Sequence, residues 1–268
     1  MGLRNTKLSA FVWATVLVFA LALACAVAVV VVVRAAPLAP YAWAQRNRLV
    51  AHAMGGVDGQ VYTNSLEAWE SNYRRGYRVF EVDLRVLSDA SVVCSHAQPS
   101  QATAGEFKAS PLAGGLTPLT VNDLAGLMAR YPDAWVMTDI KVGRGAPRDS
   151  VLRTLRSAFS GTATSRSRTI VQVYEEADWR YARKLGFENI VYSLYHQKTE
   201  DLAPSIEFAA KNNIRFVAMP KEMVTKDLVR QARLNRIWVG VYTINGDLER
   251  SEYEKLGVTH FYSDFLRP

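Results

Sequence analysis

Short apolar runs alternate with amphipathic stretches along the chain from about residue 48 onward. The runs are rich in β-branched and aromatic residues, which is typical of buried strands. A turn at Ser88-Asp89 follows the second run and predicts a hairpin return over Val92–His96. Leaving that return aside, the pattern predicts eight principal strands: Arg48–Met54, Val79–Val86, Trp135–Val142, Thr169–Tyr174, Asn189–Tyr195, Arg215–Met219, Ile237–Ile244 and His260–Ser263.

The stretches between these strands have the apolar spacing of helices. They predict helices at Ser65–Arg75, Leu119–Tyr131, Val151–Phe159, Ala177–Leu185, Leu202–Asn212, Lys226–Arg233 and Leu248–Leu256. Alternation of strands and helices predicts an α/β fold in which helices cover a parallel sheet. Eight units in one domain favour a closed (β/α)8 TIM barrel. A doubly wound open sheet is the alternative.

The N-terminal segment has a different pattern. Leu8–Val33 contains no charged residue and is flanked by Arg4, Lys7 and Arg34. A helix of this length would span about 39 Å, which exceeds a hydrocarbon core of about 30 Å. The segment therefore predicts one transmembrane helix, with the large domain outside the cytoplasm. The alternative is a cleaved signal segment, with Ala42-Trp43-Ala44 as the processing site and a secreted domain.

These patterns divide the chain into three parts. Residues 1–34 are the membrane anchor or long signal segment, residues 35–47 are a stem, and residues 48–268 are the barrel. The formal charge is +7, of which the first part contributes +3. The remaining excess suits an anionic membrane surface or a phosphate-bearing substrate, or an ordinary solvated surface. The chain has no basic and aromatic run typical of nucleic-acid binding, no readable disulfide framework, and no sign of an obligate protein partner.

Candidate catalytic residues gather where the predicted strands end. Glu81 and Asp83 are two positions apart in a strand, so both side chains point the same way, with Arg85 beyond them. Neighbouring carboxylates repel one another unless a cation lies between them or one is protonated. His52 and His96 bracket this pair in the sequence. The arrangement predicts a metal site at the carboxyl-terminal mouth of the barrel.

An ordered set of motifs resembles the glycerophosphodiester phosphodiesterase family, within the superfamily of phosphatidylinositol-phospholipase-C-like phosphodiesterases. The resemblance runs from about Arg48 to the C-terminus, and each motif alone is common. The motifs are Ala51-His52, Asn64-Ser65-Leu66-Glu67-Ala68-Trp69, Glu81-Val82-Asp83, His96, Asp139-Ile140-Lys141, Val241-Tyr242-Thr243-Ile244-Asn245, and Gly257-Val258 leading into Ser263-Asp264.

The resemblance implies a TIM-barrel hydrolase of phosphoric diesters that uses a divalent cation, Mg²⁺ or Ca²⁺. Hard cations of this kind prefer oxygen ligands. The implied ligands are Glu81, Asp83 and Asp139. His52 and His96 would share general acid and base catalysis. Lys141, Arg85 and Tyr242 would contact the phosphate or line the substrate pocket.

Some positions depart from the family pattern. Ala53 stands where the family has an arginine after the first histidine, and Ala97 stands where it has an aspartate. Asp139-Ile140-Lys141 is closer to the spider-toxin sphingomyelinase D branch. Three functions follow. The first is hydrolysis of glycerophosphodiesters or phospholipid headgroups, the second is a sphingomyelinase-like or phospholipase-D-like lipid phosphodiesterase, and the third is a non-catalytic headgroup-binding barrel.

Several positions have two interpretations. Asp264 is either a pocket residue or a turn former, and Tyr242 either lines the pocket or packs in the core. The long connection over 97–118 is either a substrate lid or a merely mobile loop. For His196 and His260 we expect surface or packing roles.

Overall fold

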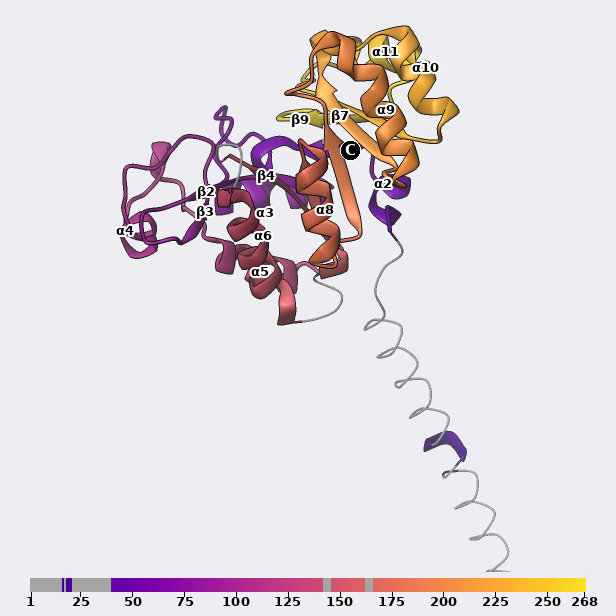
Figure 1. The fold of residues 1–268 in the computed structure, drawn as a ribbon. Helices are drawn as coiled ribbons and strands as arrows, with labels where there is room; N and C mark the ends of the chain where they lie inside the picture. The colour runs from indigo at the N-terminus through magenta and orange to yellow at the C-terminus, as the bar shows by residue number, and fades with distance from the viewer. Residues whose placement is uncertain (1–15, 17, 21–39, 142–145, 162–165) are drawn as a thin grey trace, which may run out of the picture.

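The computed structural model describes residues 16, 18–20, 40–141, 146–161 and 166–268 (Figure 1). Eight parallel strands form a closed barrel, because β1 pairs with β9 on one side and with β2 on the other. In barrel order they are β1 (Leu49–Ala51), β2 (Val79–Val86), β4 (Trp135–Ile140), β5 (Thr169–Val173), β6 (Asn189–Ser193), β7 (Phe216–Pro220), β8 (Trp238–Tyr242) and β9 (His260–Ser263). The predicted TIM barrel is therefore confirmed, and the alternative of a doubly wound open sheet is excluded.

The predicted hairpin return is also present. Strand β3 (Val92–Cys94) pairs antiparallel with the end of β2, with Leu84 opposite Cys94. The backbone N–H of Ser95 then donates to the carbonyl oxygen of Asp83 at 2.9 Å. The hairpin therefore delivers the next residue, His96, to the mouth of the barrel.

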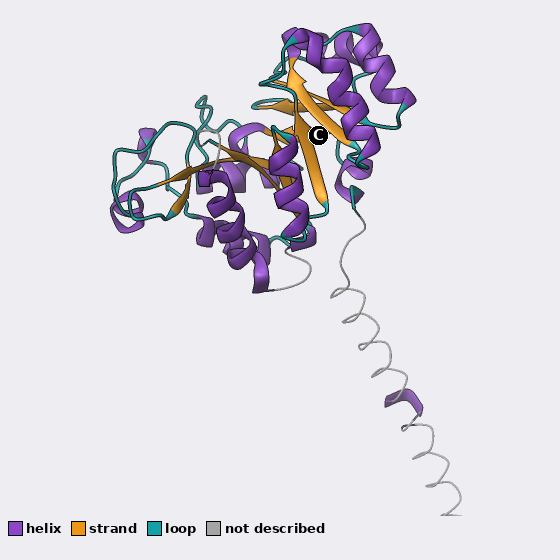
Figure 2. Ribbon diagram, in the orientation of Figure 1, coloured by secondary structure: helices purple, strands orange, loops and turns teal. Residues whose placement is uncertain are grey.

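Helices surround the barrel between successive strands (Figure 2). They are α3 (Leu66–Arg74), α5 (Val121–Arg130), α6 (Ala146–Ala158), α8 (Glu176–Lys184), α9 (Leu202–Lys211), α10 (Lys226–Leu234) and α11 (Asp247–Leu256). Side chains cap several of them. Ser65 accepts from the N–H of Ala68, and Thr120 forms a capping box with Asp123. All the predicted helices are present, with bounds that differ from the prediction by at most five residues.

Successive side chains along each strand point to opposite faces of the barrel wall, which creates two separate apolar cores. Phe80, Val82 and Leu84 point outward into the large core between barrel and helices. Val79 points inward, into a second core that fills the amino-terminal part of the barrel. Glu81 and Asp83 follow on the same inward face, so polar side chains begin where this inner core ends.

Part of the predicted stem packs against the barrel. Helix α2 (Ala42–Arg46) places Trp43, which is fully buried, at 4.8 Å between ring centroids from Phe216 in the inner core. The backbone N–H of Tyr41 donates to Asn189 Oδ1 at 2.6 Å. Residues 41–46 thus cover the amino-terminal end of the barrel, which we call the floor.

The predicted transmembrane helix lies outside the described residues, apart from residue 16 and residues 18–20. Within the part of the chain that the structure describes, no helix combines the length and apolar character needed to span a membrane.

The long connection over 97–118 carries two short elements that the sequence pattern does not predict. These are α4 (Ala104–Ala109) and a 3-10 turn at Ala113–Gly115. Phe107 of α4 packs against Leu87 and Val93 beside the hairpin. No residue of this connection lines the cavity at the mouth of the barrel, so the structure does not support the substrate-lid interpretation.

Candidate active site

A cavity of about 660 Å³ opens at the carboxyl-terminal ends of the strands. Its lining contains all but one of the residues predicted for the site: His52, Glu81, Arg85, His96, Asp139, Lys141 and Tyr242. The remaining residue, Asp83, is buried and contacts the side chains of His96 and Lys141. The structure therefore brings the whole predicted set together.

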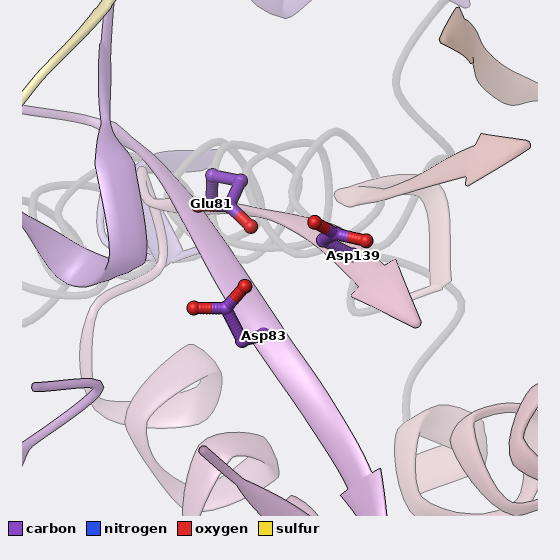
Figure 3. A group of neighbouring side chains, drawn as sticks. All are labelled: Glu81, Asp83 and Asp139. Atoms are coloured by element: carbon purple, nitrogen blue, oxygen red, sulfur yellow. The ribbon is translucent and has the colours of Figure 1, made fainter. Parts of the chain in front are cut away.

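Three carboxylates form the centre of the site. Glu81 and Asp83 come from β2, Asp139 comes from β4, and the side chains point toward one another (Figure 3). The register of the two strands sets Asp83 directly opposite Asp139. One ligand oxygen from each carboxylate lies within 4.8 Å of the others. A single cation could contact all three.

The burial of Glu81 makes this cluster suited to a cation. The backbone N–H of Ala53 donates to Glu81 Oε2 at 2.7 Å, whereas Oε1 is buried and has no hydrogen-bond partner among the described residues. Burial raises the pKa of the Glu81 carboxyl well above its usual range, and Asp83 and Asp139 raise it further. An ion at the free oxygen would offset both costs. All-oxygen ligands fit Mg²⁺ or Ca²⁺.

Lys141 partly neutralises the cluster. Its Nζ lies 2.7 Å from Asp139 Oδ2 and 3.1 Å from Asp83 Oδ1. Burial would lower the pKa of this ammonium, but the neighbouring carboxylates outweigh burial and raise it. One ammonium among three carboxylates leaves room for a divalent cation in the charge balance.

Asp83 is held ionised by its neighbours. Burial alone would raise its pKa, but the hydrogen bond with His96, the charge of Lys141 and the amide of Asn64 together lower it to about 2. Asn64 Nδ2 donates to Asp83 Oδ2 at 2.8 Å, and the N–H of Asp83 donates back to Asn64 Oδ1 at 3.0 Å. Asn64, in the connection between β1 and α3, thus fixes the Asp83 carboxylate on β2.

A tight turn after β1 positions His52. Ala53 and Met54 have positive φ values of 47° and 69°, and Gly55 follows at 85°. A Cβ at Gly55 would collide with the amide of Asn72, whose Nδ2 donates to the carbonyl oxygens of Met54 and Gly56 at 3.0 and 3.1 Å. The turn is therefore fixed from within the protein, and it points the Ala53 N–H at Glu81.

Each histidine presents Nδ1 to a carboxylate. His52 Nδ1 lies 3.1 Å from Asp264 Oδ1 and 3.3 Å from Thr243 Oγ1. His96 Nδ1 lies 3.3 Å from Asp83 Oδ2. A carboxylate at Nδ1 fixes the tautomer of an imidazole and leaves Nε2 for proton transfer. Asp264 does not itself line the cavity, but its contact with His52 makes it part of the site.

Arg85 contacts backbone groups rather than the carboxylates. Its guanidinium donates to the carbonyl oxygen of Lys141 at 2.6 Å and to that of His96 at 2.9 Å. These bonds tie the end of β4 to the hairpin that carries His96. Arg85 also lines the cavity, so its predicted contact with phosphate stays a prediction.

Several tyrosines line the cavity. Tyr242 lines the cavity and lies 3.4 Å from Ser193 through its hydroxyl, and its ring contacts Tyr262 at 5.5 Å between centroids. Tyr174, which the sequence analysis missed, donates a short hydrogen bond from its hydroxyl to Asp139 Oδ1. It therefore orients the third carboxylate of the cluster.

Tyr62 is another residue of the site that was not predicted from the sequence. Its ring centroid lies 4.9 Å from that of His52 and 4.4 Å from that of His96. The side chain is 40 % exposed, next to a similarly exposed Val61, in the connection between β1 and α3. Apolar side chains in a loop beside the Asn64 motif were the available signal.

Comparison with known proteins shows similarity at the level of structure. No family model matches the chain, and no curated protein matches it. By contrast, 45 chains of solved structures match it. Many of these structural neighbours are glycerophosphodiester phosphodiesterases.

Three of these neighbours illustrate the match. A glycerophosphodiester phosphodiesterase from Parabacteroides distasonis is 14 % identical, with a TM-score of 0.68, over 81 % of this chain and 92 % of that one. The enzyme from Thermotoga maritima is 18 % identical, with a TM-score of 0.62, over 81 % and 94 %. A phosphodiesterase from Oleispira antarctica, in complex with the product sn-glycerol-3-phosphate, is 15 % identical, with a TM-score of 0.70, over 83 % and 95 %. Similarity at these identities establishes the shared fold.

Proposed function

We propose that this protein is a metal-dependent phosphodiester hydrolase that acts on glycerophosphodiesters or phospholipid headgroups. One observation carries the proposal. Two imidazoles, each paired through Nδ1 with a carboxylate, line one cavity together with Glu81 and Asp139, two members of a cluster of three carboxylates. Acid and base groups next to a cation-binding cluster are what phosphoryl transfer requires.

The cluster of Glu81, Asp83 and Asp139 would hold the cation. When bound, a divalent cation neutralises charge that develops on the phosphoryl oxygens. Lys141, already fixed between two of the carboxylates, would bind a phosphate oxygen from the same side.

The histidines would move the protons. One imidazole would remove a proton from a water molecule as the water oxygen bonds to phosphorus, and the other would protonate the departing alcohol oxygen as its P–O bond breaks. Asp264 and Asp83 would stabilise the imidazolium forms and, by contacting Nδ1, leave Nε2 of each ring for proton transfer. No net proton is gained or lost over the cycle.

A small diester is the favoured substrate. The neighbour from Oleispira antarctica holds sn-glycerol-3-phosphate as product. The cavity of about 660 Å³ falls within the usual range for small-molecule sites. We further propose that the apolar N-terminal segment anchors the chain in a membrane, with this domain on the extracytoplasmic side.

A lipid phosphodiesterase of the sphingomyelinase or phospholipase D type is the second candidate. Two observations favour it: no arginine follows His52, and the cavity wall carries Tyr174, Tyr195 and Tyr242. An apolar wall would suit a larger alcohol than glycerol. The products separate the two functions, because a cyclic phosphate or a phosphatidate-like product indicates the second, and free glycerol phosphate indicates the first.

The test is an assay of the full chain in detergent micelles with Mg²⁺ or Ca²⁺. The substrates are glycerophosphocholine, glycerophosphoinositol, a lysophospholipid and sphingomyelin. We expect turnover of at least one of them and a loss of about 1,000-fold in the His52→Ala variant. A chain that turns over none of them, yet still binds the cation and a headgroup, would be the non-catalytic barrel.

A further inference from the structure

A second cavity lies at the floor of the barrel, opposite the proposed active site. It has a volume of about 490 Å³ and is lined by residues from the end of α2, the starts of β1 and β2, helix α11 and the last residues of the chain. Arg48 immediately precedes β1 and Arg78 immediately precedes β2. The amino-terminal ends of the strands in such barrels usually serve stability, so chemistry concentrated there calls for a separate explanation.

Positive charge is concentrated in this floor cavity. Arg46, Arg48, Arg78, Arg250 and Arg267 line it, and Glu254 is the acidic side chain among the lining residues. These side chains sum to +4. Two acids just outside the lining pair with them, because Asp133 lies 2.6 Å from Arg78 and Asp247 lies 3.4 Å from Arg250, which leaves an excess of +2 at this end.

Much of this charge is unpaired within the described residues. Arg46, Arg48 and Arg267 are exposed and have no side-chain hydrogen bond or ion pair to another described residue. Arg250, by contrast, is ion-paired: its Nη2 lies 3.4 Å from Asp247 Oδ1, and its Nε lies 3.8 Å from Glu254 Oε1. The three arginines without an acidic partner repel one another around one cavity, and an anion bound there would offset that repulsion.

We propose that the floor cavity is a binding site for a phosphate-bearing anion. Guanidinium groups bind phosphate oxygens through two parallel hydrogen bonds, and several converge here. The predicted membrane segment ends at Val33, 13 residues before Arg46. That short separation favours the headgroup of an anionic phospholipid over a free phosphate. The site does not depend on the proposed catalytic function, since no residue of the mouth cavity lines it.

The test compares two sources of the same chemistry. The full chain in detergent micelles is titrated with phosphatidylglycerol, with phosphatidylcholine as the neutral reference, and separately with inorganic phosphate. Bound lipid is counted by native mass spectrometry, and phosphate binding by the shift in Tm. The key variant replaces Arg46, Arg48 and Arg267 with Gln. A matched control replaces Arg74, Arg180 and Arg230, which are also exposed and lie outside the floor cavity.

We expect phosphatidylglycerol to bind in preference to phosphatidylcholine, and the floor variant to bind it about 100-fold more weakly. The control variant should bind like the parent, and added salt should weaken binding by the parent. Phosphate binding that depends on the floor arginines, without a lipid preference, would support the site and identify its ligand as a soluble anion. Equal binding by the parent and the floor variant, or no binding of either anion, would overturn the proposal. Hydrolysis of a soluble diester should be the same in parent and floor variant.

Discussion

The carboxylate of Asp264 lies 3.1 Å from Nδ1 of His52 and accepts a hydrogen bond at 2.9 Å from the side-chain amide of Asn245. The N–H of Asp264 donates in turn to Asn245 Oδ1 at 2.8 Å. The amide therefore fixes both the backbone and the carboxylate of Asp264, and Asp264 fixes the imidazole. The end of β9 is connected in this way to His52, the proposed catalytic histidine that directly follows β1.

This connection predicts the effect of Asp264→Asn. The neutral amide cannot stabilise an imidazolium, so we expect kcat to fall about 100-fold with KM little changed. Steady-state kinetics on whichever diester the parent hydrolyses would measure it. Asp201→Asn, at an exposed acid in the 3-10 turn before α9, is the control and should behave like the parent. An Asp264→Asn enzyme with parental kcat would mean that the ion pair is only structural.

The second prediction concerns Glu81→Gln. The raised pKa of Glu81 means that its ionised form destabilises the folded state without a cation. Gln is neutral and can still accept the hydrogen bond from the N–H of Ala53. We therefore expect the variant to be about 1 kcal/mol more stable than the parent in EDTA. With Mg²⁺ or Ca²⁺ at 100 times its Kd, the parent should gain about 2.7 kcal/mol and the variant little or nothing.

Thermal unfolding of the full chain would test this reversal, in which the variant is the more stable protein in EDTA and the parent is the more stable protein with cation. Glu188→Gln, at an exposed position, is the control and should follow the parent in both conditions. If the parent gains no stability from either cation at millimolar concentration, the carboxylate cluster is not a metal site.

The third prediction concerns the aromatic ring of Tyr62. Because the ring contacts both imidazoles, it restricts their orientations, and its hydroxyl is not needed for that. We expect Tyr62→Phe to retain kcat within about threefold and Tyr62→Ala to lose about tenfold or more, as imperfect orientation of acid and base groups does. The pair of variants is its own control. Equal losses in both would assign the effect to the hydroxyl instead.

The strands of the barrel could be predicted because each is a short, strongly apolar run between polar segments. The carboxylate cluster could also be predicted, because Glu81 and Asp83 share one face of a strand and Asp139 ends the next parallel strand. Helix α4 was missed although Thr103 and Glu106 form a capping box. Its Ala-Gly composition is a weak helical signal, and the packing of Phe107 decides the outcome.

Contacts between distant segments could not be predicted. Tyr174 reaches Asp139 across 35 residues, and nothing near either position indicates the bond. Trp43 is similar, because the prolines and polar residues around it predict a stem, whereas its ring fills the floor of the inner core. In both cases a large side chain is placed by the closure of the barrel, which is a property of the whole chain.

The floor also contains a buried histidine that predicts how stability depends on pH. His260 Nε2 lies 2.8 Å from the carbonyl oxygen of Ala44, so the ring holds α2 against the barrel. Burial lowers the pKa of His260 from 6.5 to about 4, although the bond to Ala44 acts in the other direction. Between these values the unfolded chain binds a proton that the folded chain does not. Stability from this residue is therefore complete above pH 6.5 and is lost as the pH falls toward 4, by about 3 kcal/mol in total.

We therefore expect the free energy of unfolding of the full chain in micelles to fall more steeply between pH 6.5 and 4 than that of His260→Gln. The variant should be less stable than the parent at pH 7.5, because it packs less well, and the gap should narrow by about 3 kcal/mol at pH 4. Guanidinium titrations followed by tryptophan fluorescence would measure both curves. The carboxylates that titrate below pH 5 affect parent and variant alike, so the difference between the curves isolates His260. Parallel curves across this range would show that the pKa of His260 is the same in the folded and the unfolded chain.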